Sequence, residues 1–281
     1  MRFRLFSQSM ILSVDICRLR KGVKELSKQK GSLLYKFMIW VIRHVYRTPV
    51  INGTENLPDE PCIIVSNHAK THGPIISQLY FPGRSYTWCA SQVMHLKEFP
   101  AYAFEDFWSY KPRWSHWFWH LLSHLIAPFG VCLFTNANTI ETCYDNRILS
   151  TFRNTVKVLQ DGNNVIIFPE FKEGHNQIVN QFHDGFVNVA KLYYKKTSQA
   201  IQFVPMYIAP NLCQTQLGRP VRFCPENPME EERQRICSYL MKEITEIACS
   251  LPPHQVIPYD NKIPRKKYPW NTYEGVSISE T

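Results

Sequence analysis

The sequence lacks a long apolar run. No stretch of about 18 consecutive uncharged apolar residues, the length that a membrane-spanning helix needs, occurs among its 281 residues. The best candidate, Leu33–Tyr46, is short and contains Lys36 and Arg43. The opening MRFRLF is similar to the charged start of a signal peptide, but Ser7–Ser9 and Asp15 interrupt the apolar part behind it. We therefore expect neither a membrane-spanning helix nor a cleaved signal peptide.

Several chemical signatures are also missing. The nine cysteines are odd in number and no two of them have Cys-x-x-Cys spacing, which indicates neither a disulfide framework nor a zinc site. We expect free, often buried thiols in a reducing cytoplasm instead. No Gly-x-Ser-x-Gly segment occurs, so a hydrolase with a serine or cysteine nucleophile has no such motif to support it. No internal repeat, low-complexity tract or convincing linker divides the chain.

Positive charge is concentrated at one end. Residues 1–50 contain 11 Lys and Arg against Asp15 and Glu25, a net of +9, which from totals of 32 and 23 leaves 21 basic and 21 acidic groups elsewhere. A basic segment that continues into the aromatic run around Trp40 fits an anionic membrane surface, where each Lys or Arg contributes about 1 kcal/mol. A solvated helix face packed on the body is the alternative. Nucleic acid is not expected, because no base-reading motif follows. The predicted location is cytoplasmic and peripheral to the membrane.

Apolar patterns of strand and helix type alternate along the chain. This alternation predicts an α/β fold with a mostly parallel central sheet flanked by helices. We expect three regions: a basic amphipathic N-terminal helical segment over 1–48, an α/β domain over 49–250, and a polar, loosely ordered C-terminal tail over 251–281. The expected strands are Cys62–Ser66, Tyr86–Ala90, Val131–Thr135, Val165–Phe168 and Ile201–Ile208, and the expected helices are 19–46, Pro74–Tyr80, 101–128 with a break near Pro112, Ile148–Leu159, Gly185–Tyr194 and Met229–Cys249.

Aromatic residues crowd the segment 101–128. Burial in the core is the usual fate of such residues and is our first expectation. The alternative is that part of the set lines an acyl-chain groove or lies in a lipid interface. The residues are Tyr102, Phe104, Phe107, Trp108, Trp114, Trp117, Phe118 and Trp119.

A histidine follows the first expected strand of the domain. The apolar run Ile63–Val65 leads into Ser66–Gly73 (SNHAKTHG), which places His68 just beyond the end of a buried strand. Glu170 stands in the same relation to a later apolar run, in the sequence Phe-Pro-Glu. Because ligands collect at the carboxyl ends of parallel strands, we expect both side chains on one rim of the sheet.

Five segments in this order resemble the motif blocks of the glycerolipid acyltransferase superfamily, whose type members are the lysophosphatidate (1-acylglycerol-3-phosphate) acyltransferases. The resemblance covers roughly residues 30–210 and implies that 49–250 is an acyltransferase-like domain. The segments are Gly53–His68, Gly130–Asn136 (GVCLFTN), Phe168–Glu170, Phe182–Gly185 and Val204–Met206.

The resemblance implies an O-acyltransferase of lipid metabolism that moves an acyl group from acyl-CoA or acyl carrier protein to a lysophospholipid or related glycerol-type alcohol. His68 would be the general base that removes the proton of a glycerol hydroxyl as its oxygen attacks the thioester. Asn67 would support the turn, and Glu170 would belong to the pocket for the head group of the acceptor. The thioester is a co-substrate, and neither a cofactor nor a metal is expected.

The chain departs from the family pattern at several of these positions. Asn136, which follows the expected strand Val131–Thr135 on the same rim, would belong to the acceptor pocket. It stands where an arginine is usual, which weakens the case for a phosphate-bearing acceptor. Phe171 replaces a glycine. Lys172 could restore the lost positive charge in the acceptor pocket, as a compact point charge. Gly73 stands where the family has the aspartate that orients the histidine.

Three accounts of Gly73 are open, because residues 61–97 contain no Asp or Glu that could replace the acid by a shift of register. The enzyme could be slow, since losing the orienting acid of a triad costs about 10⁴ in turnover. The domain could be a catalytically silent lipid-binding or acyl-binding relative. Otherwise another group orients His68, either a backbone carbonyl or one of His72, Glu173 and Asp184.

Two further interpretations of these residues compete with the catalytic one. His68 and His72 have the i, i+4 spacing of a metal pair on a helix, but no third ligand is evident. Glu170 could simply cap the turn that follows its strand.

Overall fold

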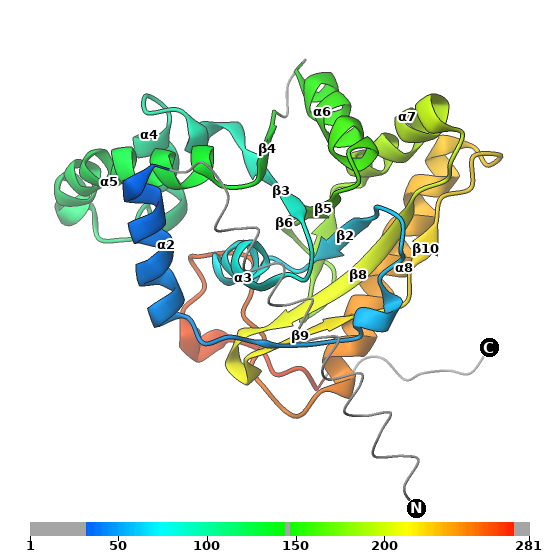
Figure 1. The fold of residues 1–281 in the computed structure, drawn as a ribbon. Helices are drawn as coiled ribbons and strands as arrows, with labels where there is room; N and C mark the ends of the chain where they lie inside the picture. Colours follow the sequence, from blue (N-terminus) through cyan, green and yellow to red (C-terminus); the bar gives the residue numbers. More distant parts are fainter. Residues whose placement is uncertain (1–31, 144–146, 273–281) are drawn as a thin grey trace, which may run out of the picture.

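The computed structural model describes residues 32–143 and 147–272, which form an α/β fold around one main sheet. The strand order is β1-β9-β8-β2-β5-β3-β4, with β10 paired to β8 (Figure 1). The strands are β1 Val50–Asn52, β2 Ile63–Ser66, β3 Ser85–Ala90, β4 Thr139–Thr142, β5 Asn164–Ile167, β8 Gln202–Ala209, β9 Gln214–Leu217 and β10 Val221–Arg222, and a separate hairpin joins β6 Glu170–Gly174 to β7 Asn180–Phe182.

Most pairings in the main sheet are parallel. Strand β2 lies between β5 and β8 and is parallel to both, and β3 is parallel to β4 and β5. Strand β8 runs antiparallel to β9 and β10. The predicted α/β class with a mostly parallel sheet is confirmed.

The helices follow most of the predicted boundaries. The part of the predicted N-terminal helix over 19–31, like the tail over 273–281, lies outside the described residues. The helices are α2 Leu33–Val45, α3 His72–Tyr80, α4 Phe99–Phe107, α5 His116–Asn136, α6 Ile148–Gln160, α7 Asn188–Thr197 and α8 Met229–Ser250.

The predicted strand Val131–Thr135 is wrong. These residues form the last turns of α5, and the strand of this region is β4, which begins at Thr139. The physical reason is that a short, mostly apolar run such as VCLFT fits a buried strand and a helix equally well. Here the run continues a helix that begins at His116 and passes through Pro128.

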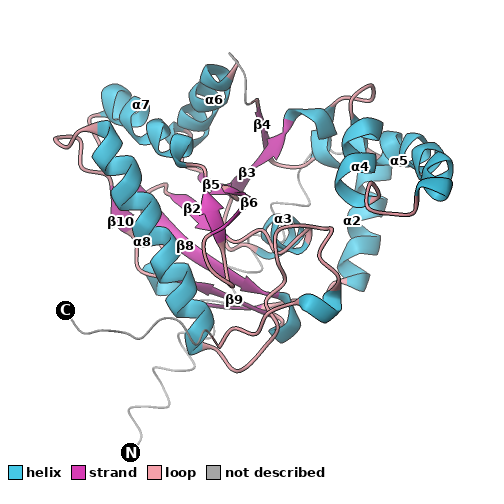
Figure 2. Cartoon of the chain, turned by 180° about the vertical axis from the view of Figure 1, so that it is seen from behind, coloured by secondary structure: helices cyan, strands magenta, loops and turns pink. Residues whose placement is uncertain are grey.

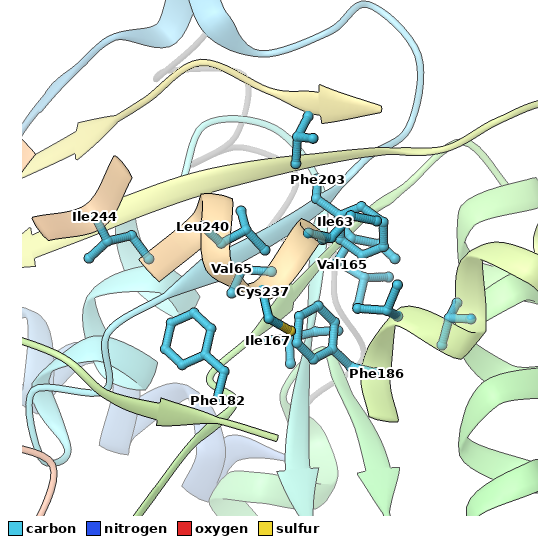
Figure 3. Packing of buried hydrophobic residues seen from close by; sticks show 14 of the residues in the cluster. Ile63, Val65, Val165, Ile167, Phe182, Phe186, Phe203, Cys237, Leu240 and Ile244 are labelled. Carbon is cyan, nitrogen blue, oxygen red and sulfur yellow. The ribbon is translucent and has the colours of Figure 1, made fainter. Parts of the chain in front are cut away.

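Alternating side chains of the central strands supply both faces of the sheet. Ile63 and Val65 of β2 belong to the core on the side of α6, α7 and α8, together with Leu240 of α8 (Figures 2 and 3). Ile64 belongs to a second core on the other side, where Ile76 of α3 packs. This period-2 burial explains why all four residues of β2 are buried.

Helices α2, α4 and α5 lie beside the sheet rather than on it (Figures 1 and 2). Phe99 of α4 packs so closely on α5 that a Cβ on Gly130 would lie 2.2 Å from its ring. The expected burial of the aromatic cluster is wrong for Trp114 and Trp117, which are 81% and 69% exposed. The reason is that α5 packs against α4, α2 and Ser91–Met94 and leaves its other face open, and that Trp114 lies in the short helix Arg113–Ser115 before α5.

One helix of the structure bears on the expected absence of a membrane-spanning helix, which stays a prediction. Arg113–Asn136 is, within the described ranges, a helical stretch long and apolar enough to cross a membrane, and 11% of its most apolar window is buried. Three histidines, a proline and a glycine interrupt this stretch, so a search of the sequence for consecutive apolar residues does not find it. Length and composition alone do not show a span.

The C-terminal tail packs against the body as far as Trp270 and Asn271. His254, Val256 and Asn271 are buried, and Asn271 donates hydrogen bonds to the carbonyls that end α8. The segment returns from the end of α8 toward α3 (Figure 1). The expectation of a loosely ordered tail is therefore wrong for residues 252–272, because polar side chains here bond to the chain rather than to solvent.

Candidate active site

His68 lies where the central parallel strands end. Strand β2 finishes at Ser66, and its neighbours β5 and β8 run in the same direction, so their carboxyl ends share one rim. The ring of His68 meets the ring of Phe168 edge-on, with 5.3 Å between centroids. The Oε2 of Glu170 accepts a hydrogen bond from the backbone N–H of His68. The expectation that His68 and Glu170 share a rim matches this arrangement.

Asn67 ties the start of the turn to β8. Its Nδ2 donates to the carbonyl of Ile208 at 3.1 Å, and its Oδ1 accepts from the N–H of Ile208 at 2.8 Å. The side chain thereby continues the ladder between β2 and β8 by one more pair of bonds. Because Asn67 is 1% exposed, loss of either bond would leave a buried polar group unsatisfied.

The turn after His68 has an unusual backbone. Ala69 and Lys70 have φ values of 45° and 56°, the left-handed region that costs a non-glycine residue about 1 kcal/mol or more. The turn brings the carbonyl of Lys70 onto Nδ1 of His68. A carbonyl can only accept, so Nδ1 carries the hydrogen and Nε2 keeps its lone pair.

The surroundings of His68 favour its neutral form. The residue is half-buried overall, and desolvation of its ring lowers the pKa from 6.5 to about 4, although the bond to the Lys70 carbonyl opposes the shift. The imidazole is therefore neutral, and available as a base, at any pH well above 4. The same shift weakens it as a base relative to a solvated histidine.

Glu170 holds the backbone of the site. The side chain is 6% exposed, and its second oxygen, Oε1, accepts from the N–H of Asn180 at 2.8 Å. Burial raises the pKa of its carboxyl to about 7, against the two N–H groups that lower it. Glu170 thus joins the His68 turn to the β6–β7 hairpin. Its contacts face the backbone, and its predicted role toward an acceptor head group stays a prediction.

Gly73 fits a space that has no room for a side chain. Its N–H donates to the carbonyl of His68 at 3.1 Å in the first turn of α3. A Cβ at this position would lie 2.5 Å from that carbonyl oxygen and 2.9 Å from the ring of Phe168. An aspartate cannot occupy position 73 unless the turn itself moves.

Among the groups that could orient His68, the backbone carbonyl of Lys70 is the one that bonds to Nδ1. Nδ1 of His72 is bonded to the hydroxyl of Tyr46 at 3.2 Å. Asp184 forms an ion pair with Arg233 at 3.6 Å, and Glu173 is exposed. Among residues 32–143 and 147–272, the group that orients His68 is therefore a backbone carbonyl and not an acid.

The remaining predicted residues are dispersed. Asn136 ends α5, where its side chain bonds to the carbonyl of Cys132 and to the N–H of Ser32. The expectation that it follows a strand on the rim is wrong, because the segment before it is helical. Phe171 stacks on His183 with 4.2 Å between ring centroids. Lys172 lies in β6.

Two sets of contacts at the site could not be predicted from a sequence motif. The ring of Tyr259, from the C-terminal segment, meets His68 edge-on at 5.3 Å and an interplanar angle of 82°. The Nζ of Lys70 donates to the carbonyls of Asn261 and Ile263 at 3.3 and 2.9 Å. Neither contact belongs to a motif, and both depend on the path of residues 252–272.

An open cavity of about 810 Å³ lies away from this site. Glu60 and Ala200, which line it, precede β2 and β8, so the cavity is at the amino ends of the central strands. His68 is at their carboxyl ends. The cavity is therefore not the entrance to the His68 site.

No protein-family model and no curated protein matches the chain. Among solved structures, the chain is similar to the 1-acyl-sn-glycerophosphate (LPA) acyltransferase PlsC from Thermotoga maritima, with 16% sequence identity and a TM-score of 0.46. The match covers 90% of this chain and 86% of that one.

We predict that Gly73→Asp destabilises the protein instead of restoring a family-type acid. The new Cβ would overlap the carbonyl of His68, and such overpacking costs about 1–3 kcal/mol. Urea unfolding measures the change, with Gly185→Ala as the control because a Cβ there meets no atom within 4 Å. A Gly73→Asp variant as stable as the control would show that the turn adapts and that the steric account is wrong.

Proposed function

We propose that the protein is an O-acyltransferase in which His68 is the general base. The observation that carries the proposal is the orientation of this ring: Nδ1 is bonded to a carbonyl at the carboxyl end of a buried parallel strand, which leaves Nε2 as the basic atom. The acyltransferase-like order of the sequence motifs supports the same reaction. The proposed donor is an acyl thioester of coenzyme A or of acyl carrier protein, and the proposed acceptor is a lysophospholipid or related glycerol-type alcohol.

The proposed step moves one proton and one acyl group. Nε2 of His68 takes the proton of the acceptor hydroxyl as that oxygen bonds to the thioester carbonyl carbon. The tetrahedral intermediate then breaks its C–S bond, and the departing thiolate takes the proton from the imidazolium. The products are an ester and a free thiol, and the imidazole returns to its neutral form.

A carbonyl supplies only part of what a carboxylate supplies. It fixes the ring tautomer, but it carries no full negative charge to stabilise the imidazolium that forms during the step. We therefore propose a slower reaction than in relatives with the acid. The full loss of about 10⁴ applies where the wrong tautomer results, and here the tautomer is retained.

The acceptor pocket is proposed to lie beside the β6–β7 hairpin. Lys172 lies in β6 next to Phe171 and is the proposed source of positive charge for a polar head group. Glu170 supports this hairpin through its bond to Asn180. We do not propose Asn136 for the pocket, because its side chain is bonded within α5 and to the start of α2.

We predict that His68→Ala lowers the rate of acyl transfer to a small fraction of the wild-type rate. The assay incubates the purified full chain with labelled acyl-CoA or acyl carrier protein and a panel of lysolipids. Loss of a general base lowers the rate by about 10²–10⁴-fold. A His95→Ala variant is the control, because His95 pairs with Glu141 at 3.1 Å away from the His68 turn.

Equal transfer by the wild type and by His68→Ala would rule out the base role. Transfer by neither protein across the whole panel would favour a catalytically silent protein that binds lipids or acyl groups. Retention of labelled acyl chains without turnover would identify that alternative directly.

We also propose that the protein acts at an anionic membrane surface on the cytoplasmic side, bound through α2 and α5. The two helices are neighbours (Figure 1). Both expose large apolar side chains. Lys36 and Arg43 on α2, and Arg113 before α5, add positive charge beside these faces. The exposed apolar residues are Leu33, Leu34, Phe37, Trp40, Val41 and Val45 of α2 and Trp117, Phe118, Leu121, Leu125 and Phe129 of α5.

We predict that Trp117→Ser with Leu121→Ser weakens binding to anionic vesicles by at least about tenfold, since burying each side chain contributes about 1.5–3 kcal/mol. The matched control is Trp270→Ser with Leu149→Ser, because these residues are 54% and 57% exposed on other elements. Vesicle sedimentation measures both. Equal losses in the two double variants, or no loss in the first, would show that α5 is not the lipid-binding face.

A further inference from the structure

The left-handed turn after His68 is a conformation that other parts of the protein must hold. Ala69 and Lys70 are consecutive non-glycine residues with positive φ. Such residues persist where the surrounding structure over-determines them. If Lys70 relaxed to an ordinary backbone conformation, its carbonyl would leave Nδ1 of His68. The orientation of the ring therefore depends on what fixes Lys70.

The side chain of Lys70 is fixed by the C-terminal segment. Its ammonium donates to the carbonyls of Asn261 and Ile263 and lies 5.0 Å from the centre of the Tyr268 ring. The backbone carbonyls accept without adding a negative charge to the site. Lys70 is therefore held at two points. Its carbonyl bonds to Nδ1 of His68, and its ammonium bonds to a segment nearly two hundred positions later in the chain.

That segment is itself anchored at three places. The Nδ2 of Asn261 donates to Asp106 of α4 at 3.0 Å. The Nδ2 of the buried Asn271 donates to the carbonyl of Ala248 at 2.7 Å. Farther back, the hydroxyl of Tyr207 and Nε2 of His254 are 2.9 Å apart in a buried contact. The segment that receives Lys70 is therefore a fixed support rather than a loose tail.

We propose that Lys70 and this segment form a C-terminal clamp, consisting of Lys70 with Tyr259, Asn261, Ile263 and Tyr268, that positions His68 in place of the missing acid. The clamp holds the turn so that the Lys70 carbonyl keeps its bond to Nδ1. Tyr259 limits the tilt of the ring through its edge-on contact. Lys70 is a positioning residue, since its side chain acts on His68 through the backbone.

The clamp explains how position 73 can be glycine. In the family pattern that the sequence resembles, a carboxylate orients the ring from the first turn of the following helix. Here the first turn of α3 packs against the carbonyl of His68 and leaves no room for an acid. The His68 ring is oriented instead through Lys70 by the C-terminal segment. The inference rests on the proposed function for its catalytic meaning, but the geometry it describes can be tested without turnover.

We expect Lys70→Met to lower kcat by about tenfold to a hundredfold, the cost of a small misplacement of a catalytic group, with KM changed less than about threefold. Lys70→Arg keeps a cationic donor and should retain most of kcat. Asn261→Ala removes the bond to Asp106 that anchors the clamp, so this variant should also lower kcat. Because both changes act on one device, the double variant should lose less than the product of the two single losses.

A Lys70→Met variant with unchanged kcat would overturn the proposal, as would losses that multiply independently in the double variant. A rise in KM alone would assign Lys70 to substrate binding and would equally overturn the positioning role.

A chemical readout separates this proposal from the proposed function. Diethyl pyrocarbonate modifies neutral imidazoles, and mass spectrometry resolves the rate at each histidine. Lys70→Met should label His68 several-fold faster than the wild type, while the buried His254 keeps its rate. Equal labelling of His68 in the two proteins overturns the clamp, whether or not the wild type transfers acyl groups. If Lys70→Met fails to fold, faster labelling at both histidines reveals it, and Asn261→Ala then decides in the same assay.

Discussion

The hydrogen bond from Nδ1 of His68 to the carbonyl of Lys70 is the interaction on which the site depends. It determines which nitrogen of the imidazole is basic, and it exists only because two residues adopt left-handed backbone conformations. The fold supplies the support for this turn. Asn67 binds it to β8, and Glu170 binds it to the β6–β7 hairpin. Each of these bonds joins the turn to a different element, so the strained backbone has no easy direction in which to relax.

The same arrangement explains the chemistry that can be expected of the site. Burial keeps the imidazole of His68 neutral, and the carbonyl keeps its tautomer, so the base is present and oriented at neutral pH. The imidazolium that forms during proton transfer gains less than it would beside a carboxylate. The ring of His68 is therefore well oriented, but its protonated form is only weakly stabilised. In the proposed function, slow transfer would take place at a membrane surface that concentrates the proposed lipid substrates, and the exposed faces of α2 and α5 fit that proposal.

Much of the fold could be predicted from the sequence, because its signals are local. Apolar runs with turns between them predicted β2, β5 and β8, and the position of His68 after β2 followed from them. The end of α5 could not be predicted in this way, since Val131–Thr135 has no period of its own. The turn at Ala69 and Lys70 could not be predicted either, because no glycine marks its positive φ values. The approach of Tyr259 to His68 is a long-range contact, and local patterns carry no information about such contacts.

The ring nitrogens of His68 can be observed directly by ¹⁵N NMR of protein labelled at histidine, with His68→Ala used to assign the signals. The account predicts a neutral ring with hydrogen on Nδ1 at pH 7, and no protonation until the pH approaches about 4. Hydrogen on Nε2 at neutral pH, or protonation near the ordinary value of 6.5, would contradict it.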